Sequence, residues 1–289
     1  MKTKKAILCA LLAAVLYAIH SPLSKLLLAE VSATMMAAFL YLGAGLGLFA
    51  VGVVRRICGR KEKEQPLTKR ELPYTVGMIL LDIAAPIFLM IGLSKTTAAN
   101  ASLLNNFEIV ATSVIALVVF KEAISAKLWT AIALVVISSM ILSFEDLSSF
   151  SFSYGSLFVL AACVCWGFEN NCTRKLSAKN PLEIVVIKGF GSGLGALVVA
   201  FVVGESLPYW GYIVCALLVG FVSYGLSIYF YIYAQRDLGA AKTSTYYAVA
   251  PFVGAGLSLL IFWELPSLSF VIALTIMAAG TWLATVDSQ

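Results

Sequence analysis

The sequence predicts an all-α integral membrane protein, with ten transmembrane helices arranged as two inverted five-helix repeats. Three observations lead to this prediction: the composition, the spacing of the apolar runs and an internal repeat. Of the 289 residues, 61% are hydrophobic and only 12% are charged, and the mean hydropathy is +0.95. Soluble domains carry about 25% charged residues and cannot hide so much apolar surface. The solvent of these side chains is therefore lipid.

Ten apolar runs are bounded by charged residues, glycine and proline, and each is close to the ~20 residues that cross a bilayer. The predicted helices lie near residues 6–28, 32–54, 74–93, 97–119, 127–144, 154–176, 181–203, 211–234, 243–262 and 267–286. Residues 55–73 form the one long hydrophilic connector, which must be aqueous. Two domains are expected, 1–144 and 154–286, each holding five helices.

The distribution of basic residues predicts the orientation of the chain. With a cytoplasmic N-terminus, 17 of the 20 lysines and arginines fall on cytoplasmic segments and 2 on outer ones, while Lys188 lies within a helix. This bias follows the positive-inside rule, so both termini are expected in the cytoplasm and the protein in the plasma or inner membrane. Because these cations occupy the connectors between helices and form no exposed stripe, the expected partner is the lipid bilayer and not nucleic acid.

Comparing the chain with itself reveals a repeat. Residues 41–47 (YLGAGLG) match residues 189–195 (GFGSGLG) at an offset of 148, and Phe120-Lys-Glu122 matches Phe262-Trp-Glu264 at an offset of 142. The first helix matches the sixth at an offset of 149, with Tyr17, His20, Ser24 and Lys25 opposite Trp166, Glu169, Thr173 and Arg174. Such a repeat indicates how the helices are grouped into larger units, which the apolar runs taken one at a time do not.

Five helices per half is an odd number, so the second half must enter the membrane from the opposite side. Inverted repeats of this kind are the usual construction of secondary transporters, with the site near the membrane midplane. The repeated glycines lie two and four residues apart, and this spacing predicts close contact between helices.

The chain resembles the ten-helix EamA-type members of the drug/metabolite transporter superfamily. The resemblance covers nearly the whole length and rests on the two halves, on Trp166-Gly167, on residues 96–102 (TTAANAS) and on the Phe-x-Glu ends at Glu122 and Glu264. Pro251 is also family-like, whereas Ile109 stands at the matching place in the first half. The resemblance implies a metabolite or drug transporter, often an exporter, with its substrate in a central cavity between the halves.

Asn105, Glu108 and Thr112 follow one another at helical spacing and should line one face of the fourth helix. At ~1.5 Å per residue, Glu108 would lie about 16 Å deep, near the bilayer centre. No lysine or arginine of its own half reaches that depth. Because burial disfavours the charged form, Glu108 is predicted to exchange protons or to bind substrate.

Other polar residues within predicted helices complete the set of candidates. The substrate-binding candidates besides Glu108, Asn105 and Thr112 are Tyr17, His20, Trp166, Glu169, Tyr224, Tyr231 and Tyr247. Asp82 and His20 join Glu108 as proton-coupling candidates, with Lys188 as one partner that could neutralise Asp82. Glu169 and Lys188 have matching depths on neighbouring helices, which predicts a structural ion pair.

The leading hypothesis is therefore a secondary active transporter, an exporter of small organic metabolites such as amino acids, amines or drug-like heterocycles, with proton coupling. An uncoupled facilitator is the alternative. An intramembrane enzyme is disfavoured because the chain has one histidine and neither an HExxH nor a GxSxG motif, and no P-loop indicates an ATP-driven pump. No cofactor or metal is expected, and the chain is expected to act as a monomer or weak dimer.

Overall fold

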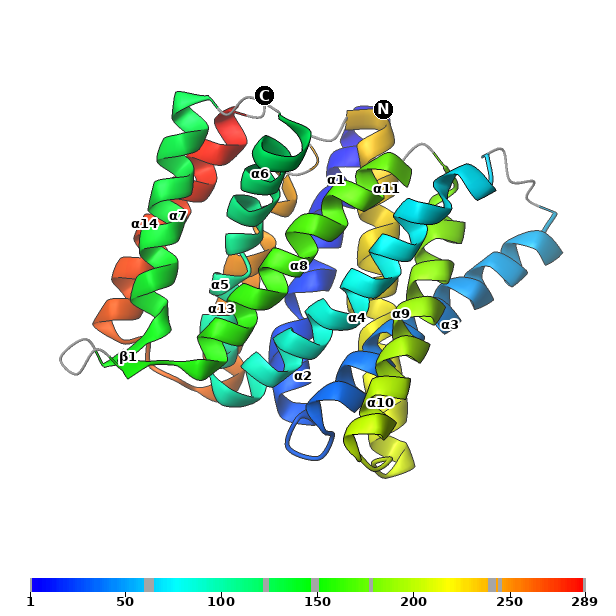
Figure 1. Ribbon diagram of the computed structural model, residues 1–289, viewed down its shortest axis with the longest axis horizontal. Coiled ribbons are helices and arrows are strands. Elements are labelled where there is room, and N and C mark those ends of the chain that lie inside the picture. Colours follow the sequence, from blue (N-terminus) through cyan, green and yellow to red (C-terminus); the bar gives the residue numbers. More distant parts are fainter. Residues whose placement is uncertain are drawn as a thin grey trace.

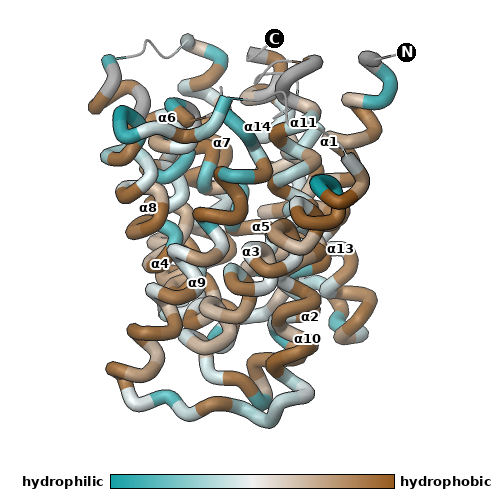
Figure 2. The backbone as a smooth tube through the Cα atoms, turned by 90° about the vertical axis from the view of Figure 1, so that its right-hand side faces the viewer, coloured by the Kyte–Doolittle hydropathy of each residue, from teal (hydrophilic) through white to brown (hydrophobic). Residues whose placement is uncertain are grey.

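The computed structural model describes residues 2–59, 65–121, 125–146, 151–176, 179–238, 243 and 246–287. Long helices run side by side through the molecule, and both chain ends lie at the same face (Figure 1). We call this the terminal face. Hydrophobic residues cover most of the length of the helices (Figure 2). An even number of crossings explains why the chain begins and ends at one face.

The first half holds five spans. The helices α1 and α2 together form one span, and α5 and α6 together form another. The helices of this half are α1 (Lys2–Ala18), α2 (His20–Leu27), α3 (Ala33–Ile57), α4 (Leu72–Lys95), α5 (Ala98–Leu104), α6 (Phe107–Phe120) and α7 (Ala126–Ser143), with a 3₁₀ turn η1 (Lys69–Glu71) before α4.

The second half repeats this order, and the third of its spans contains a π-helix. Its helices are α8 (Tyr154–Leu176), α9 (Pro181–Val203), α10 (Trp210–Gly220), the π-helix η2 (Phe221–Leu226), α11 (Ser227–Leu238), α13 (Ala250–Phe262) and α14 (Leu268–Asp287). Across the described residues, seven helical spans are long and apolar enough to cross a membrane, and shorter apolar helices lie at 250–262 and 268–284.

The packing between the halves follows their internal symmetry. The helices α3, α5 and α7 each pack on their own counterparts, α9, α13 and α14. The helix α4 packs on α8 just as η2 and α11 pack on α1 (Figure 1). The predicted fold, ten transmembrane helices in two inverted five-helix repeats, is therefore confirmed.

The repeated glycines lie where helices touch. A methyl group placed on Gly189 of α9 would lie 2.4 Å from the backbone nitrogen of Gly45 in α3. One placed on Gly193 would lie 2.7 Å from the backbone nitrogen of Leu42. Only glycine lets the two backbones approach this closely, so the glycine run sets the distance between α3 and α9.

Several predicted spans are interrupted, which the apolar pattern does not indicate. Proline lacks the N–H that would bond four residues back, so Pro22 leaves the carbonyl of Ala18 without its helical partner, and the chain breaks between α1 and α2. Pro251 likewise leaves the carbonyl of Tyr247, four residues earlier, without its helical partner just before α13. The break between α5 and α6 has no proline.

The segment between the halves also differs from the prediction of helices alone. Residues Phe144–Asp146 (β1) pair antiparallel with Ser151–Phe152 (β2), at the face opposite the termini (Figure 1). The backbone N–H of Ser153 donates to the carbonyl of Ser143 at 2.7 Å. The chain reverses here between α7 and α8, and this short pairing satisfies backbone groups at the turn.

Candidate functional site

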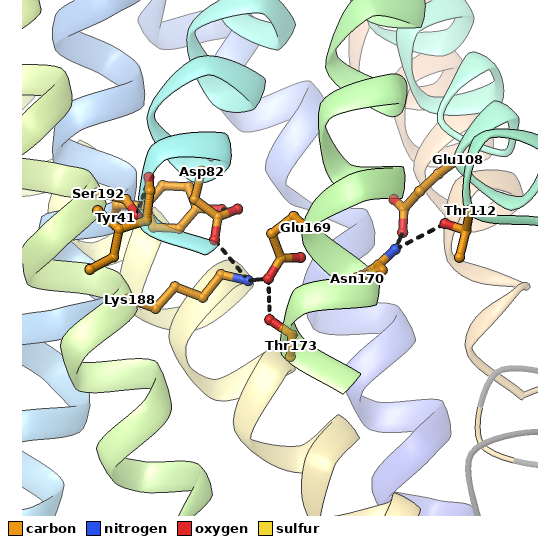
Figure 3. Close-up of polar contacts among 10 residues, drawn as sticks. Tyr41, Asp82, Glu108, Thr112, Glu169, Asn170, Thr173, Lys188 and Ser192 are labelled. Atoms are coloured by element: carbon orange, nitrogen blue, oxygen red, sulfur yellow. Dashed lines mark hydrogen bonds and ion pairs between the residues drawn. The ribbon is translucent and has the colours of Figure 1, made fainter. Parts of the chain in front are cut away.

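Three charged side chains meet inside the bundle. Nζ of Lys188, on α9, lies 3.0 Å from Oδ2 of Asp82 on α4 and 2.9 Å from Oε1 of Glu169 on α8 (Figure 3). All three are buried, with relative exposures of 7%, 0% and 3%. We call Asp82, Glu169 and Lys188 the charged cluster. One lysine faces two carboxylates, so the cluster carries one formal negative charge when all three ionise.

Hydroxyl groups complete the charged cluster. The phenol of Tyr41, on α3, donates to Oδ1 of Asp82 at 2.7 Å, and the hydroxyl of Thr173 donates to Glu169 (Figure 3). The structure thus brings together Glu169 and Lys188 and adds Asp82 to the same lysine. Sequence reasoning missed Tyr41. A signal was present, because Tyr41 lies one helical turn before Gly45 in the repeated glycine run.

Glu108 has a different kind of partner. It lies in the first turn of α6, directly after the break, where the helix dipole favours negative charge. Nδ2 of Asn170, on α8, donates to Oε1 of Glu108 at 2.6 Å and approaches Oγ1 of Thr112 at 3.3 Å (Figure 3). Within the described part of the chain, no ion pair reaches Glu108. Its carboxyl is therefore held by a neutral amide.

The predicted polar stripe of the fourth span is only partly continuous. Asn105 and Asn106 form the turn between α5 and α6, and the backbone N–H of Glu108 donates to the carbonyl of Asn105 at 3.1 Å. Thr112 joins Glu108 through the amide of Asn170. Nδ2 of Asn106 donates to the carbonyl of Leu103 at 3.3 Å. Asparagine side chains compete in this way with helical hydrogen bonds, which accounts for a break without proline.

The tyrosines of the candidate set gather with His20 in a second cluster. The ring centroid of Tyr17 lies 4.5 Å from that of His20, 6.0 Å from Tyr224 and 5.8 Å from Tyr247. The rings of His20 and Tyr224 are 5.6 Å apart. We call Tyr17, His20, Tyr224 and Tyr247 the aromatic cluster. Its residues come from α1, α2, η2 and the helical residues 246–247 that precede α13.

Two further tyrosines extend the aromatic cluster. The ring of Tyr231 lies 4.8 Å from that of Tyr247. The ring of Tyr41 stands edge-on to Tyr224, with centroids 5.2 Å apart, while its hydroxyl reaches Asp82. Tyr41 therefore joins the aromatic cluster to the charged one.

The polar atoms of the aromatic cluster are unequally satisfied. Nδ1 of His20 lies 2.8 Å from the carbonyl oxygen of Tyr17, and Nε2 lies 3.2 Å from the hydroxyl of Ser21. A neutral ring, donating through Nδ1, satisfies both contacts. The hydroxyl of Tyr224 has no hydrogen-bond partner among the described residues, although Tyr224 is only 2% exposed. Buried hydroxyls are rarely left in this state.

The remaining candidates lie elsewhere. Trp166 is 5% exposed and packs within the main hydrophobic core. Nζ of Lys25 donates to the carbonyls of Leu93 and Thr96, at 2.6 and 2.8 Å, and so caps the C-terminal end of α4. Glu264 is exposed, and Glu122 lies outside the described residues.

A polar pocket of about 520 Å³ opens at the face opposite the termini. Lys25, Lys95, Asn100 and Glu264 are among the residues that line it. It shares no residue with the charged or aromatic clusters, which lie within the bundle.

Comparisons with known proteins agree with this architecture. An uncharacterized transporter of Methanothermobacter thermautotrophicus (strain Delta H) is 26% identical over 293 residues, covering 94% of this chain and 83% of the relative. A solved crystal structure superimposes with a TM-score of 0.70 at 17% identity, covering 98% of this chain and 97% of the other, and this likeness concerns the fold.

The family comparison is more specific. The model of the EamA-like transporter family matches the chain twice, over residues 4–144 and 153–286. This double match confirms the resemblance to EamA-type members of the drug/metabolite transporter superfamily. Together with the apolar spans, it identifies a multi-pass membrane protein. The chain belongs to the EamA-like transporter family and is a membrane transporter.

Proposed function

We propose that the protein is a secondary active transporter of small organic metabolites, working by alternating access, and that a proton and the substrate compete for Glu108. The observation that carries this proposal is the contrast among the carboxylates inside the bundle. Asp82 and Glu169 face Lys188, whereas Glu108 has an amide and no ion pair within the described residues. Glu108 is the acid left for an incoming cation or proton to neutralise.

Competition at one carboxyl group is sufficient to couple two fluxes. An unpaired charge in a low-dielectric site is costly, so the empty charged form seldom crosses between the two conformations. The protonated form and the substrate-bound form are both neutralised and do cross. Each turnover then exchanges a proton for a substrate molecule, and an existing proton gradient drives accumulation.

The fold supplies the elements that alternating access requires. Two halves of opposite orientation can exchange conformations and so open toward either side in turn. The break at Ile19 and the π-helix η2 interrupt helices at the aromatic cluster, and the break at Asn105 and Asn106 lies just before Glu108. Half-helices on either side of such a break can tilt independently.

We further propose export across the plasma or inner membrane, with the terminal face in the cytoplasm. The asymmetry of 17 basic residues against 2 supports this orientation. Both halves belong to one chain, so a monomer carries a complete site. Cysteines introduced at residues 55–73 of a cysteine-free variant should resist labelling by an impermeant maleimide in intact cells. Rapid labelling there would show that the orientation is the opposite one.

Transport in proteoliposomes tests the coupling. Labelled tryptophan and labelled benzyltrimethylammonium serve as probes, because neither crosses lipid readily by itself. With the interior more acidic than the exterior, wild-type protein should accumulate at least one probe, and a proton ionophore should abolish accumulation. Glu108→Gln keeps the shape and removes the charge, so it should fold but lose pH-dependent transport.

The matched control is Glu30→Gln, since Glu30 is an exposed carboxylate outside both clusters. This variant should transport like wild type. Wild-type rates and pH dependence in Glu108→Gln would reject the role of Glu108. Transport to equilibrium without accumulation would favour the uncoupled facilitator.

A further inference from the structure

We propose that the aromatic cluster recognises an organic ammonium ion, and that the unpaired hydroxyl of Tyr224 favours ammonium ions that carry N–H groups over quaternary ones. This inference rests on the proposed transport function and names its substrate class. It draws on three features of the described residues: the placing of the rings, the balance of buried charge and the unsatisfied hydroxyl of Tyr224.

The first feature is the grouping of electron-rich ring faces. Tyr17 has three aromatic neighbours within 6.0 Å, His20, Tyr224 and Tyr247. Tyr17 and Tyr247 are half-buried, so their surfaces are not fully sealed by protein atoms. A cation is attracted to the face of a tyrosine ring within about 6 Å of its centroid, and more strongly where water is excluded.

The second feature is the balance of buried charge. Lys188 is the one buried lysine or arginine of the described residues, and it already faces both Asp82 and Glu169. When ionised, Glu108 is close enough to Tyr17, Tyr224 and Tyr247 to act on their hydroxyls through space. The interior around the aromatic cluster therefore has an excess of negative charge, which favours a cationic ligand over an anionic one.

The third feature is the hydroxyl of Tyr224. The hydroxyl of Tyr41 donates its hydrogen bond to Asp82, and that of Tyr247 lies 3.4 Å from Oγ of Ser227. The hydroxyl of Tyr224 has no such partner among the described residues. Its oxygen can accept a hydrogen bond from a primary or secondary ammonium N–H. A quaternary ammonium ion has no N–H and cannot satisfy it.

Two ligands that share a ring and a charge, but carry either N–H groups or methyl groups on the nitrogen, test the assignment. Benzylammonium and benzyltrimethylammonium share a ring and a charge, and their binding to the purified full-length protein can be measured by calorimetry at pH 7. Wild-type protein should bind both. Tyr224→Phe keeps the ring and removes the hydroxyl, so it should weaken benzylammonium about tenfold and leave benzyltrimethylammonium within about twofold.

Further variants separate the contribution of the rings from that of the hydroxyl. Tyr17→Leu removes one ring face and should weaken both ligands about tenfold, whereas Tyr17→Phe should keep most of the affinity for each. Tyr209→Phe is the control for tyrosine substitution, because Tyr209 is 66% exposed and lies outside both clusters. It should bind both ligands like wild type.

The outcomes distinguish this inference from the proposed function. An equal effect of Tyr224→Phe on the two ligands would overturn the role of the hydroxyl and would fit a water at that position. Failure of a folded wild-type protein to bind either ligand would overturn the ammonium site, even where coupled tryptophan transport in proteoliposomes persists. Selective binding without any coupled transport would instead reject the transport mechanism and keep the site.

Discussion

The charged cluster and the aromatic cluster lie side by side but differ in whether their buried polar atoms have partners. In the first, Lys188 and two hydroxyls face the carboxylates of Asp82 and Glu169. In the second, the hydroxyl of Tyr224 is left without a partner among the described residues. A buried group that finds its partner inside the protein contributes to the fold, whereas one that does not is open to a partner from outside it, such as a water or a ligand. Substitutions in the two clusters should therefore have different consequences.

Lys188→Met should cause the largest loss of stability. It leaves Asp82 and Glu169 facing each other without a cation, and breaking a buried ion pair in this way costs about 3–5 kcal/mol. Thermal unfolding in detergent measures the loss. Adding Glu169→Gln should restore only part of it, because Asp82 remains unpaired. The triple variant with Asp82→Asn should recover most of it, and a triple no more stable than Lys188→Met would show that the cluster is not held by charge.

Tyr41→Phe should have the next largest effect. It removes the hydrogen bond to the carboxylate of Asp82, and a buried bond to a charged group is worth about 1.5–3 kcal/mol. Chemical or thermal unfolding of the purified variant gives the difference. Unchanged stability would mean that Lys188 alone satisfies Asp82.

Gly193→Leu tests the contact that brings α3 and α9, and so Tyr41 and Lys188, together. The added side chain would meet Leu42, and overpacking of this kind costs on the order of 1–3 kcal/mol. Gly256→Leu is the matched control, because a methyl group at Gly256 has no atom within 4 Å. Equal stability of the two variants would reject close packing as the role of the repeated glycines.

Tyr224→Phe should have the smallest effect on stability, and of the opposite sign to Tyr41→Phe. Removing a hydroxyl that has no partner removes the cost of its desolvation, so the free energy of unfolding should be unchanged or higher by up to about 1 kcal/mol. Thermal unfolding in detergent should then show the same or a higher unfolding temperature. The same chemical change thus distinguishes the two clusters. A loss as large as that of Tyr41→Phe would show that Tyr224 has a partner, such as a bound water.

Much of the fold was predictable because a bilayer imposes simple lengths and an inverted repeat imposes symmetry. The ends of α9 and α8 coincide with the predicted runs, 181–203 and 154–176. The breaks within the spans were harder to predict from the sequence. Pro22 and Pro251 indicate where two spans are interrupted, but the turn at Asn105 and Asn106 depends on side-chain hydrogen bonds that no apolar pattern records.

The candidate residues could be chosen by residue type and depth, but only one pair of partners among them was predicted. Glu169 and Lys188 were paired from depth on adjacent helices. Asn170 contacts Glu108 across the two halves, through the packing of α6 on α8. Tyr41 reaches Asp82 within the first half, through the packing of α3 on α4. Contacts of this kind depend on tertiary packing, which one sequence does not determine.

The three helix pairs that join each helix to its own counterpart, α3 with α9, α5 with α13 and α7 with α14, have the geometry of an isologous interface. In a homodimer of identical five-helix chains, every side chain near the two-fold axis would occur twice. The fused chain is free of that constraint: Tyr41 occupies the place of Gly189, and His20 that of Glu169. Covalent fusion therefore allows divergence across the axis, so that one chain holds a lysine between two carboxylates on one side and a group of tyrosines on the other.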